Sequence, residues 1–345
     1  MRLHKIKLTF VLVLALGVLS TGALSAELGT KQNPIQWLFP PSTNATVIED
    51  VANEIAKDIF EMTGLYIEPH VTADYAALIE AVKASDGDTM ATPTTDQYCR
   101  LYIETNGQVH PRLAAVRYGY PYYFASVYGW REDFDYQPTP EEALEVLEGK
   151  TWIYNDVGST SGYVVPNKVF KNNDVELAGK VESGGHTASI IALLEKRGDF
   201  ATAYGSPPTP PDGVDFQWEY GDDPEIWIWN HALDKLYPEE VRGKIYDARQ
   251  AAADTGMYEY WDVIEKIGVI TTFGPMPNDA LTFGPGFPKD VEDEIVEAVT
   301  KHIRTEEGAE LWGDSNFYEW TDVEPITDDY YDGYRELVGY PVPEE

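Results

Sequence analysis

Cysteine is nearly absent from this sequence of 345 residues, in which Cys99 is the single example. One cysteine cannot form an intramolecular disulfide, and no cysteines or histidines have the spacing of a zinc site. The six histidines are scattered along the chain without paired spacing. We therefore expect Cys99 to be a buried free thiol, and we expect neither a metal site nor a cofactor.

Positive charge is also scarce. The chain has 25 lysines and arginines against 59 aspartates and glutamates, for a formal net charge of −34. Such a surface repels nucleic acid and anionic lipid, so nucleic acid is excluded as a partner. It also repels an anionic solute at long range. A site for such a solute would therefore have to act through hydrogen-bond donors at short range.

The first 26 residues have the composition of a secretory signal peptide. Three basic residues precede an apolar stretch at about residues 8–19, which is too short to span a membrane comfortably. Small residues at Ala23 and Ala26 offer cleavage sites, and no cysteine nearby suggests a lipoprotein signal. The sequence predicts a cleaved signal at 1–26 and a periplasmic or extracellular protein. The alternative is an uncleaved anchor.

The rest of the chain alternates strand-like and helix-like segments. The first series has strands at 35–40, 65–71, 89–93 and 111–119, with helices at 45–64 and 73–85. A second series has strands at 122–130, 150–156 and 200–205, with helices at 139–149 and 186–199. A proline-rich loop is expected at 206–213, and the pattern of 214–262 is not readable. Such alternation favours mostly parallel sheets covered by helices on both faces.

This pattern predicts an α/β protein of two lobes joined by a hinge. The expected divisions are 27–121 for the first part of lobe 1, 122–265 for lobe 2, and 266–345 for a return to lobe 1 with C-terminal helices. Ligands of open α/β sheets collect at the carboxyl ends of strands. We therefore looked for polar residues at such an end.

Residues 155–166, NDVGSTSGYVVP, place three adjacent hydroxyls between two glycines at the end of a strand. A strand that turns into a helix here leaves backbone N–H groups free and adds the positive end of the helix dipole. Ser159, Thr160 and Ser161 add neutral donors. The set suits a small oxyanion. Because proline breaks a helix interior, we expect the helix to restart at Pro166.

Two other interpretations fit the same turn. A lone serine at a strand–helix junction is usually only an N-cap. A secreted phosphoester hydrolase could use Ser159 or Ser161 with His186 as its base, but the GxSxG pattern fails because Thr160 holds the central position. No orienting carboxylate is evident for that histidine.

The turn and its surroundings resemble the phosphonate- and phosphite-binding proteins of ABC importers, which are type II periplasmic-binding proteins. The likeness covers about residues 35–337. It is carried by VTADYAALIEAVKA (71–84), NDVGSTSGYVVP (155–166), ESGGHTASIIALLEKRGDFATAYGS (182–206) and GPMPND (274–279). The second of these is the most specific match.

The resemblance implies a set of ligand-binding residues and no catalytic ones. By motif these are Ser159, Thr160, Ser161, His186, Tyr98 and Tyr75. The loop after Ala203 lacks the acids that relatives use for the ammonium of aminoalkyl phosphonates, which favours phosphite, phosphate or methylphosphonate. The implied partner is the membrane permease of an ABC importer, served by a monomer. A sensor kinase remains an alternative partner.

A ferric-ion binder of the same fold is a rival function. The chain has 23 tyrosines and many carboxylates, and tyrosinate with carboxylate suits a hard cation. Most of those tyrosines are expected to pack or to line surfaces.

Overall fold

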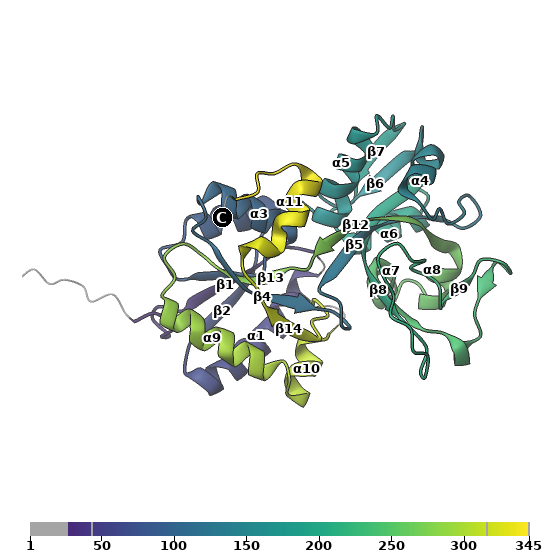
Figure 1. Cartoon of the computed structure of the whole chain (residues 1–345). Helices are drawn as coiled ribbons and strands as arrows, with labels where there is room; N and C mark the ends of the chain where they lie inside the picture. The colour runs from purple at the N-terminus through teal and green to yellow at the C-terminus, as the bar shows by residue number, and fades with distance from the viewer. Residues whose placement is uncertain (1–26, 43, 315–316, 344–345) are drawn as a thin grey trace, which may run out of the picture.

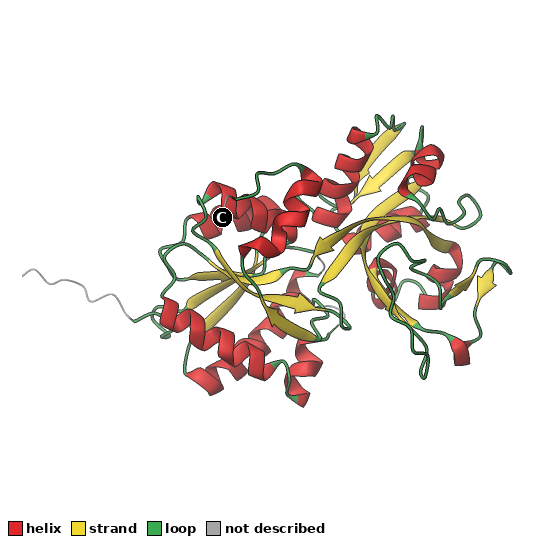
Figure 2. Ribbon diagram, in the orientation of Figure 1, coloured by secondary structure: helices red, strands yellow, loops and turns green. Residues whose placement is uncertain are grey.

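The computed structural model describes residues 27–42, 44–314 and 317–343. The predicted signal peptide, 1–26, lies outside the described residues. Within them the chain forms two six-stranded sheets, each flanked by helices (Figures 1 and 2). This confirms the predicted two-lobed α/β fold class. No helix of the described residues is long and apolar enough to span a membrane.

The first sheet has the strand order β14-β4-β13-β3-β1-β2. Its strands are β1 (Ile35–Phe39), β2 (Ile67–Val71), β3 (Thr89–Ala91), β4 (His110–Val116), β13 (Ala280–Phe283) and β14 (Asp322–Pro325). Its helices are α1 (Ala45–Thr63), α2 (Tyr75–Lys83), α3 (Thr95–Glu104), α9 (Lys289–His302), α10 (Glu306–Trp312) and α11 (Asp332–Val338), the last preceded by the 3-10 turn η3 (Asp328–Tyr331). Helices α1, α9 and α10 lie on one side of this sheet, and α3 and α11 lie on the other (Figure 1).

Helix α1 shows how the sequence specifies these elements. Asn44 caps its start by accepting from the Thr46 N–H at 3.1 Å, and Gly64 ends it in the left-handed conformation at φ 77. The buried residues recur at helical spacing: Ile48, Ala52, Ile55, Ala56 and Ile59. The helix therefore buries a single apolar face against the sheet.

The second sheet has the order β12-β5-β8-β6-β7, with β11 paired to β8. Its strands are β5 (Tyr122–Trp130), β6 (Thr151–Tyr154), β7 (Gly179–Glu182), β8 (Phe200–Thr209), β11 (Lys244–Asp247) and β12 (Ile267–Pro277). Its helices are α4 (Pro140–Leu147), the π-helical turn η1 (Thr160–Val164), α5 (Val165–Asn172), α6 (His186–Leu194), α7 (Ala248–Asp254) and α8 (Tyr260–Lys266). The sequence pattern predicted no elements for the segment 214–262. This segment contains a small hairpin of β9 (Trp229–Asn230) and β10 (Lys235–Leu236) and the 3-10 turn η2 (Glu239–Val241).

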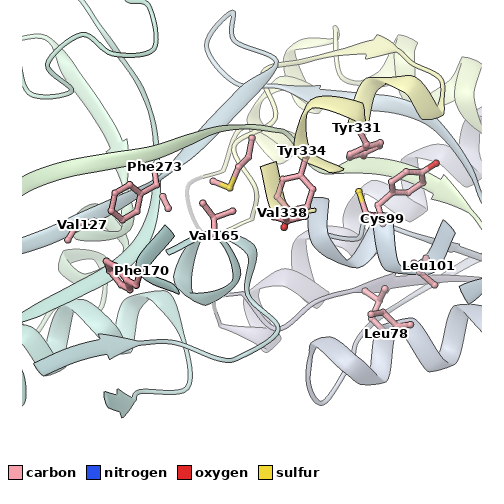
Figure 3. Close-up of a cluster of buried hydrophobic side chains, with 14 of the residues drawn as sticks. Leu78, Cys99, Leu101, Val127, Val165, Phe170, Phe273, Tyr331, Tyr334 and Val338 are labelled. Atoms are coloured by element: carbon pink, nitrogen blue, oxygen red, sulfur yellow. The ribbon is translucent and has the colours of Figure 1, made fainter. Parts of the chain in front are cut away.

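Alternating side chains of the second sheet supply two different cores. Trp152 and Val127 pack in one cluster with α4 and α5, whereas their neighbours Ile153 and Tyr128 pack in another with α6, α7 and α8. This is the period of two that a strand covered on both faces requires. The first cluster continues into the other lobe, where Val165 of α5 lies near Tyr334 and Val338 of α11 (Figure 3). Cys99 belongs to the same cluster as a buried free thiol, as predicted.

The pairing differs from the sequence prediction in three places. Each sheet is mixed: β1 and β6 pair in parallel with their neighbours, but β4, β5, β11, β12, β13 and β14 pair antiparallel. The predicted return to lobe 1 begins at 266, whereas β12 still pairs with β5 in the second sheet, and β13 is the next strand to join the first.

The third difference is the predicted loop at 206–213, which is wrong in its first four residues. Strand β8 continues to Thr209, through Pro207 and Pro208. Here β8 pairs only with β11, and the pairing jumps from Ser206 to Thr209 across a register shift. Proline is tolerated because its missing N–H falls where no ladder bond is made.

Buried charges anchor the segment 214–262, for which the sequence pattern predicted no helices or strands. Glu225, fully buried, accepts from Arg131 at 2.7 Å just after β5 and from Arg249 of α7. It also accepts from the Val269 N–H of β12 at 3.2 Å. Arg249 in turn binds Asp247 at 2.6 Å. One carboxylate thus links the segment 214–262 to the end of β5 and to β12.

Candidate functional site

A cavity of about 80 Å³ lies between the two sheets. Residues of both lobes line it. The first lobe contributes Pro40, Ser42, Tyr75, Thr92, Thr94, Arg117, Asp279, Phe317, Tyr318 and Glu319, and the second contributes Tyr123, Ser159, Thr160, Ser161, His186 and Tyr204. Since one water needs roughly 10–15 Å³ measured this way, the cavity holds a group of only a few non-hydrogen atoms.

The three adjacent hydroxyls lie at the carboxyl end of β6, as the sequence predicted, and all are buried. Ser159 caps the turn by accepting from the Gly162 N–H at 3.2 Å. Its carbonyl accepts from both Tyr163 and Val164, which makes the first turn π-helical. The helix then continues as α5, with Pro166 in its first turn as expected. The N–H groups of Thr160 and Ser161 open the helical segment, where donors have no intrahelical acceptor.

The other lobe holds this turn in place. The Asp96 N–H, in the first turn of α3, donates to the Thr160 hydroxyl at 3.2 Å. Tyr75, also from the first lobe, lines the same cavity as Ser159 and Thr160. No described residue forms a hydrogen bond with the Ser161 hydroxyl. Two of the three hydroxyls are therefore engaged within the protein, and Ser161 presents a free one.

His186 begins α6 and lines the cavity beside Ser159. Its Nε2 lies 3.5 Å from the Ser159 hydroxyl, and its Nδ1 has no hydrogen-bond partner among the described residues. Burial lowers the pKa of His186 to about 4, so the imidazole is neutral at neutral pH. A neutral ring can donate one N–H to an anion. No described carboxylate orients the ring, as a hydrolytic triad would require.

Acid is expected to weaken the fold through His186. Between its folded pKa of about 4 and its unfolded value of 6.5, the unfolded chain binds the proton first, so stability falls as the pH falls through this window. From pH 7 to pH 5 the wild type should lose about 2 kcal/mol more than His186→Phe. Urea unfolding of both proteins at the two pH values measures this difference. An equal pH dependence in the two proteins would contradict it.

Tyr98 lies outside the cavity, although the resemblance placed it in the site. It is fully buried in α3, its ring stacks on Tyr331 at 4.1 Å, and its hydroxyl donates to Asp328 at 2.5 Å. These contacts tie α3 to the C-terminal segment. The structure therefore brings together five of the six predicted residues and directs the sixth away from them.

Three charged residues that the sequence did not nominate also line the cavity. Arg117, after β4, donates to Asp279 at 2.7 Å and to the Tyr318 carbonyl at 2.7 Å. Asp279 accepts a second bond from the Trp320 indole at 2.9 Å. Glu319 accepts from the Tyr118 hydroxyl at 3.2 Å. Asp279 ends the motif at 274–279 and could have been predicted as a site residue from it. No motif around Glu319 indicates a place in the site.

These acids remove one argument about the ligand. The loop after Ala203 carries no carboxylate into the cavity, as predicted, but Asp279 and Glu319 reach it from other elements. The absence of acids from that loop therefore cannot favour a ligand without an amine.

Tyrosinate is disfavoured here, which weakens the ferric-ion alternative. Burial raises the pKa of Tyr123 to about 12 and raises that of Tyr75 further. Within the described residues, no group of three or more His, Cys, Asp and Glu side chains is placed to hold a metal ion.

Two α/β lobes with a cavity between them are the architecture of a solute-binding protein. The family model for the periplasmic substrate-binding protein of phosphonate ABC transporters matches residues 38–331. The chain belongs to this family. Membership places the protein outside the cytoplasm. Proteins of this kind bind small solutes and deliver them to membrane permeases. The family match gives no support to the ferric-ion or hydrolase alternatives.

Solved structures share the fold at low identity. The chain is similar to a binding protein component of an ABC phosphonate transporter from Pseudomonas aeruginosa, with 16% identity, a TM-score of 0.62, and coverage of 88% of this chain and 85% of that one. PhnD1 from Prochlorococcus marinus, solved with methylphosphonate, has 11% identity, a TM-score of 0.62, and coverage of 88% and 96%. A Xanthomonas citri protein bound to chloride has 14% identity, a TM-score of 0.59, and coverage of 88% and 96%. No curated protein matches the sequence.

Proposed function

We propose that this protein captures a small phosphorus oxyanion between its lobes for import. The observation that carries the proposal is the hydroxyl turn, Ser159–Ser161, which lines a cavity of about 80 Å³ between the lobes. Phosphite, phosphate and methylphosphonate have only a few non-hydrogen atoms, which suits this volume. The methylphosphonate bound to PhnD1, a protein of similar fold, supports testing that ligand first.

Neutral donors can hold the anion despite the acidic surface. Ser161, the first N–H groups of the turn, and the His186 ring all reach the cavity from fixed elements. Each charge-assisted hydrogen bond contributes roughly 1.5–3 kcal/mol, and pre-placed donors lower the ordering cost of binding. Burial between the lobes excludes water and strengthens each bond.

Calorimetric titration with phosphite, phosphate and methylphosphonate tests the proposal. Binding of at least one of them near or below micromolar concentrations is expected. Absence of binding by all three would refute it. Ferric ion and a generic aryl phosphate, added in parallel, test the two rival functions, which predict a visible charge-transfer colour and turnover, respectively.

Ser161→Ala should weaken binding of the preferred oxyanion about ten- to hundredfold, because one charge-assisted hydrogen bond is lost. Stability should stay unchanged, since no described residue forms a hydrogen bond with this hydroxyl. Ser206→Ala is the matched control, because Ser206 is a buried serine of the same lobe that does not line the cavity. Equal affinities of Ser161→Ala and wild type would remove Ser161 from the site.

The remaining parts of the proposal concern the cell. We propose a signal peptide at 1–26, a monomer, and a first division between the lobes near 121. The partner is the permease of an ABC importer, with a sensor kinase as the alternative. Binding of the loaded protein to permease-containing vesicles would separate the two partners.

A further inference from the structure

Glu319 lines the ligand cavity, and among the described residues its carboxyl group accepts one hydrogen bond. The residue is 6% exposed and follows Tyr318 in the loop before β14. Among the described residues, its hydrogen bond comes from the Tyr118 hydroxyl at 3.2 Å. Asp279, the other cavity acid, is held by Arg117 and by the Trp320 indole. Glu319 is thus the acid with hydrogen-bonding capacity left for a ligand.

Charged and titratable groups surround Glu319 from both lobes. Burial raises its pKa to about 7, and Arg117 only partly opposes this because Asp279 already pairs with that guanidinium. The groups that face it from the second lobe are Tyr204, Tyr246, Asp247 and Asp254. The acids among them favour the protonated form of Glu319. His186, which lines the same cavity, is neutral at neutral pH.

A fully ionised carboxylate would oppose the ligand that the hydroxyl turn attracts. Two unit charges about 4 Å apart repel by roughly 4 kcal/mol at a dielectric constant near 20, which is more than one hydrogen bond contributes. A single proton between the carboxyl and a ligand oxygen turns this repulsion into a hydrogen bond. The cavity therefore favours an oxyanion that can share a proton.

We propose that Glu319 and the bound oxyanion share one proton, so that the cavity selects oxyanions that protonate near neutral pH and rejects sulfate, which does not. This inference rests on the proposed function and names the property by which the site selects its ligand. Phosphite, phosphate and methylphosphonate all lose their second proton near neutrality, as phosphate esters do at about pH 6. The proton belongs either to the Glu319 carboxyl facing a dianion or to the P–OH of a monoanion facing the carboxylate. Both descriptions contain the same atoms and charge.

Proton uptake by the wild-type protein is the first test. Calorimetry with methylphosphonate at about pH 8, in buffers of different ionisation enthalpy, should show uptake of about one proton per ligand bound. Affinity should fall about tenfold per pH unit once both partners are ionised, in accord with proton linkage. Binding without uptake and without pH dependence would overturn the inference. This measurement uses no variant, so it does not depend on how a variant folds.

Glu319→Gln is the second test, with Glu324→Gln on β14 as the control outside the cavity. The amide keeps its hydrogens at every pH. The variant should bind methylphosphonate without the loss of affinity that the wild type shows above neutral pH, and its preference for methylphosphonate over sulfate should fall at least tenfold. A variant that keeps the wild-type pH profile and still rejects sulfate would overturn the inference.

Two further outcomes separate the possible explanations. If the wild type binds no phosphorus oxyanion, the proposed function itself fails. If it binds methylphosphonate but Glu319→Gln changes only a preference for aminomethylphosphonate, then Glu319 binds an ammonium group and the shared-proton inference is wrong.

Discussion

Gly162→Ala is expected to abolish oxyanion binding and to destabilise the protein. A Cβ at Gly162 would lie 1.7 Å from the Asn155 Oδ1 and 2.4 Å from its Cγ. Asn155 is fully buried at the end of β6 and cannot swing into solvent. The Gly162 carbonyl is also fixed by the Thr202 hydroxyl at 2.6 Å. The turn that carries Ser159, Thr160 and Ser161 must therefore lift away from the sheet.

The expected loss of stability is about 1–3 kcal/mol or more, which is the usual cost of overpacking a tight site. Binding should fall by at least a hundredfold, because a displacement of about 1 Å removes the alignment of several donors together. Urea unfolding and calorimetry with methylphosphonate measure the two effects. Wild-type affinity in this variant would show that the hydroxyl turn does not hold the ligand.

Two variants serve as controls for Gly162→Ala. Gly185→Ala lies at the start of α6 near the same cavity, but its Cβ would meet no atom within 4 Å, and its φ of 176 is open to any residue. It should behave as wild type. In an Asn155→Ala background, which removes the three atoms nearest to the added Cβ, Gly162→Ala should cost much less. This non-additivity identifies the clash as the cause.

Glu225→Gln is expected to destabilise the second lobe by about 3–5 kcal/mol, the usual cost of removing one partner from a buried ion pair. The nearly buried Arg131 would lose the carboxylate that compensates it, and the fully buried Arg249 would keep only Asp247. The segment 214–262 would lose its ion-paired connection to the end of β5. Urea unfolding at neutral pH measures the effect.

The pH dependence gives this prediction a second readout. Burial alone would raise the pKa of Glu225, but Arg131 and Arg249 lower it to about 2. Because the folded value lies below the unfolded 4.5, the stabilisation is present above pH 4.5 and is lost as the pH falls toward 2. The difference between wild type and Glu225→Gln should shrink over that range.

Glu132→Gln is the matched control for Glu225→Gln. Glu132 pairs with Lys196 at 2.7 Å, but both side chains are more than half exposed, at 62% and 59%. Removing an exposed pair costs about 0–1 kcal/mol. Equal effects of the two substitutions would contradict the view that the buried pair anchors the segment.

Much of the fold could be predicted because each element carries its own signal. The apolar face of α1 and the glycine that ends it are local features, as is the short run of apolar residues that makes β6 a strand buried on both faces. The mixed pairing of the sheets was not predictable in this way. A strand's own residues do not say which edge it joins, and β12 is apolar enough for either lobe.

In the candidate site, too, local sequence predicted some residues, and long-range packing decided the others. Ser159, Thr160 and Ser161 are contiguous, so one strand–helix junction brings them together. Tyr98 was assigned to the site by resemblance, but it lies one turn into α3 on the face that packs against Tyr331. Glu225 lies in a segment without periodicity, and its role depends on two arginines that come before and after it in the chain.

By itself, the sequence determined the class of this protein: two α/β lobes and a turn of neutral donors, since strand, helix and turn form from residues close together in the chain. Only the tertiary structure decided what faces that turn. Tyr75, Arg117, Asp279 and Glu319 reach the cavity from separate elements of the other lobe, up to 160 positions away in the chain. Long-range packing, which local patterns do not encode, places a carboxyl group beside the proposed anion.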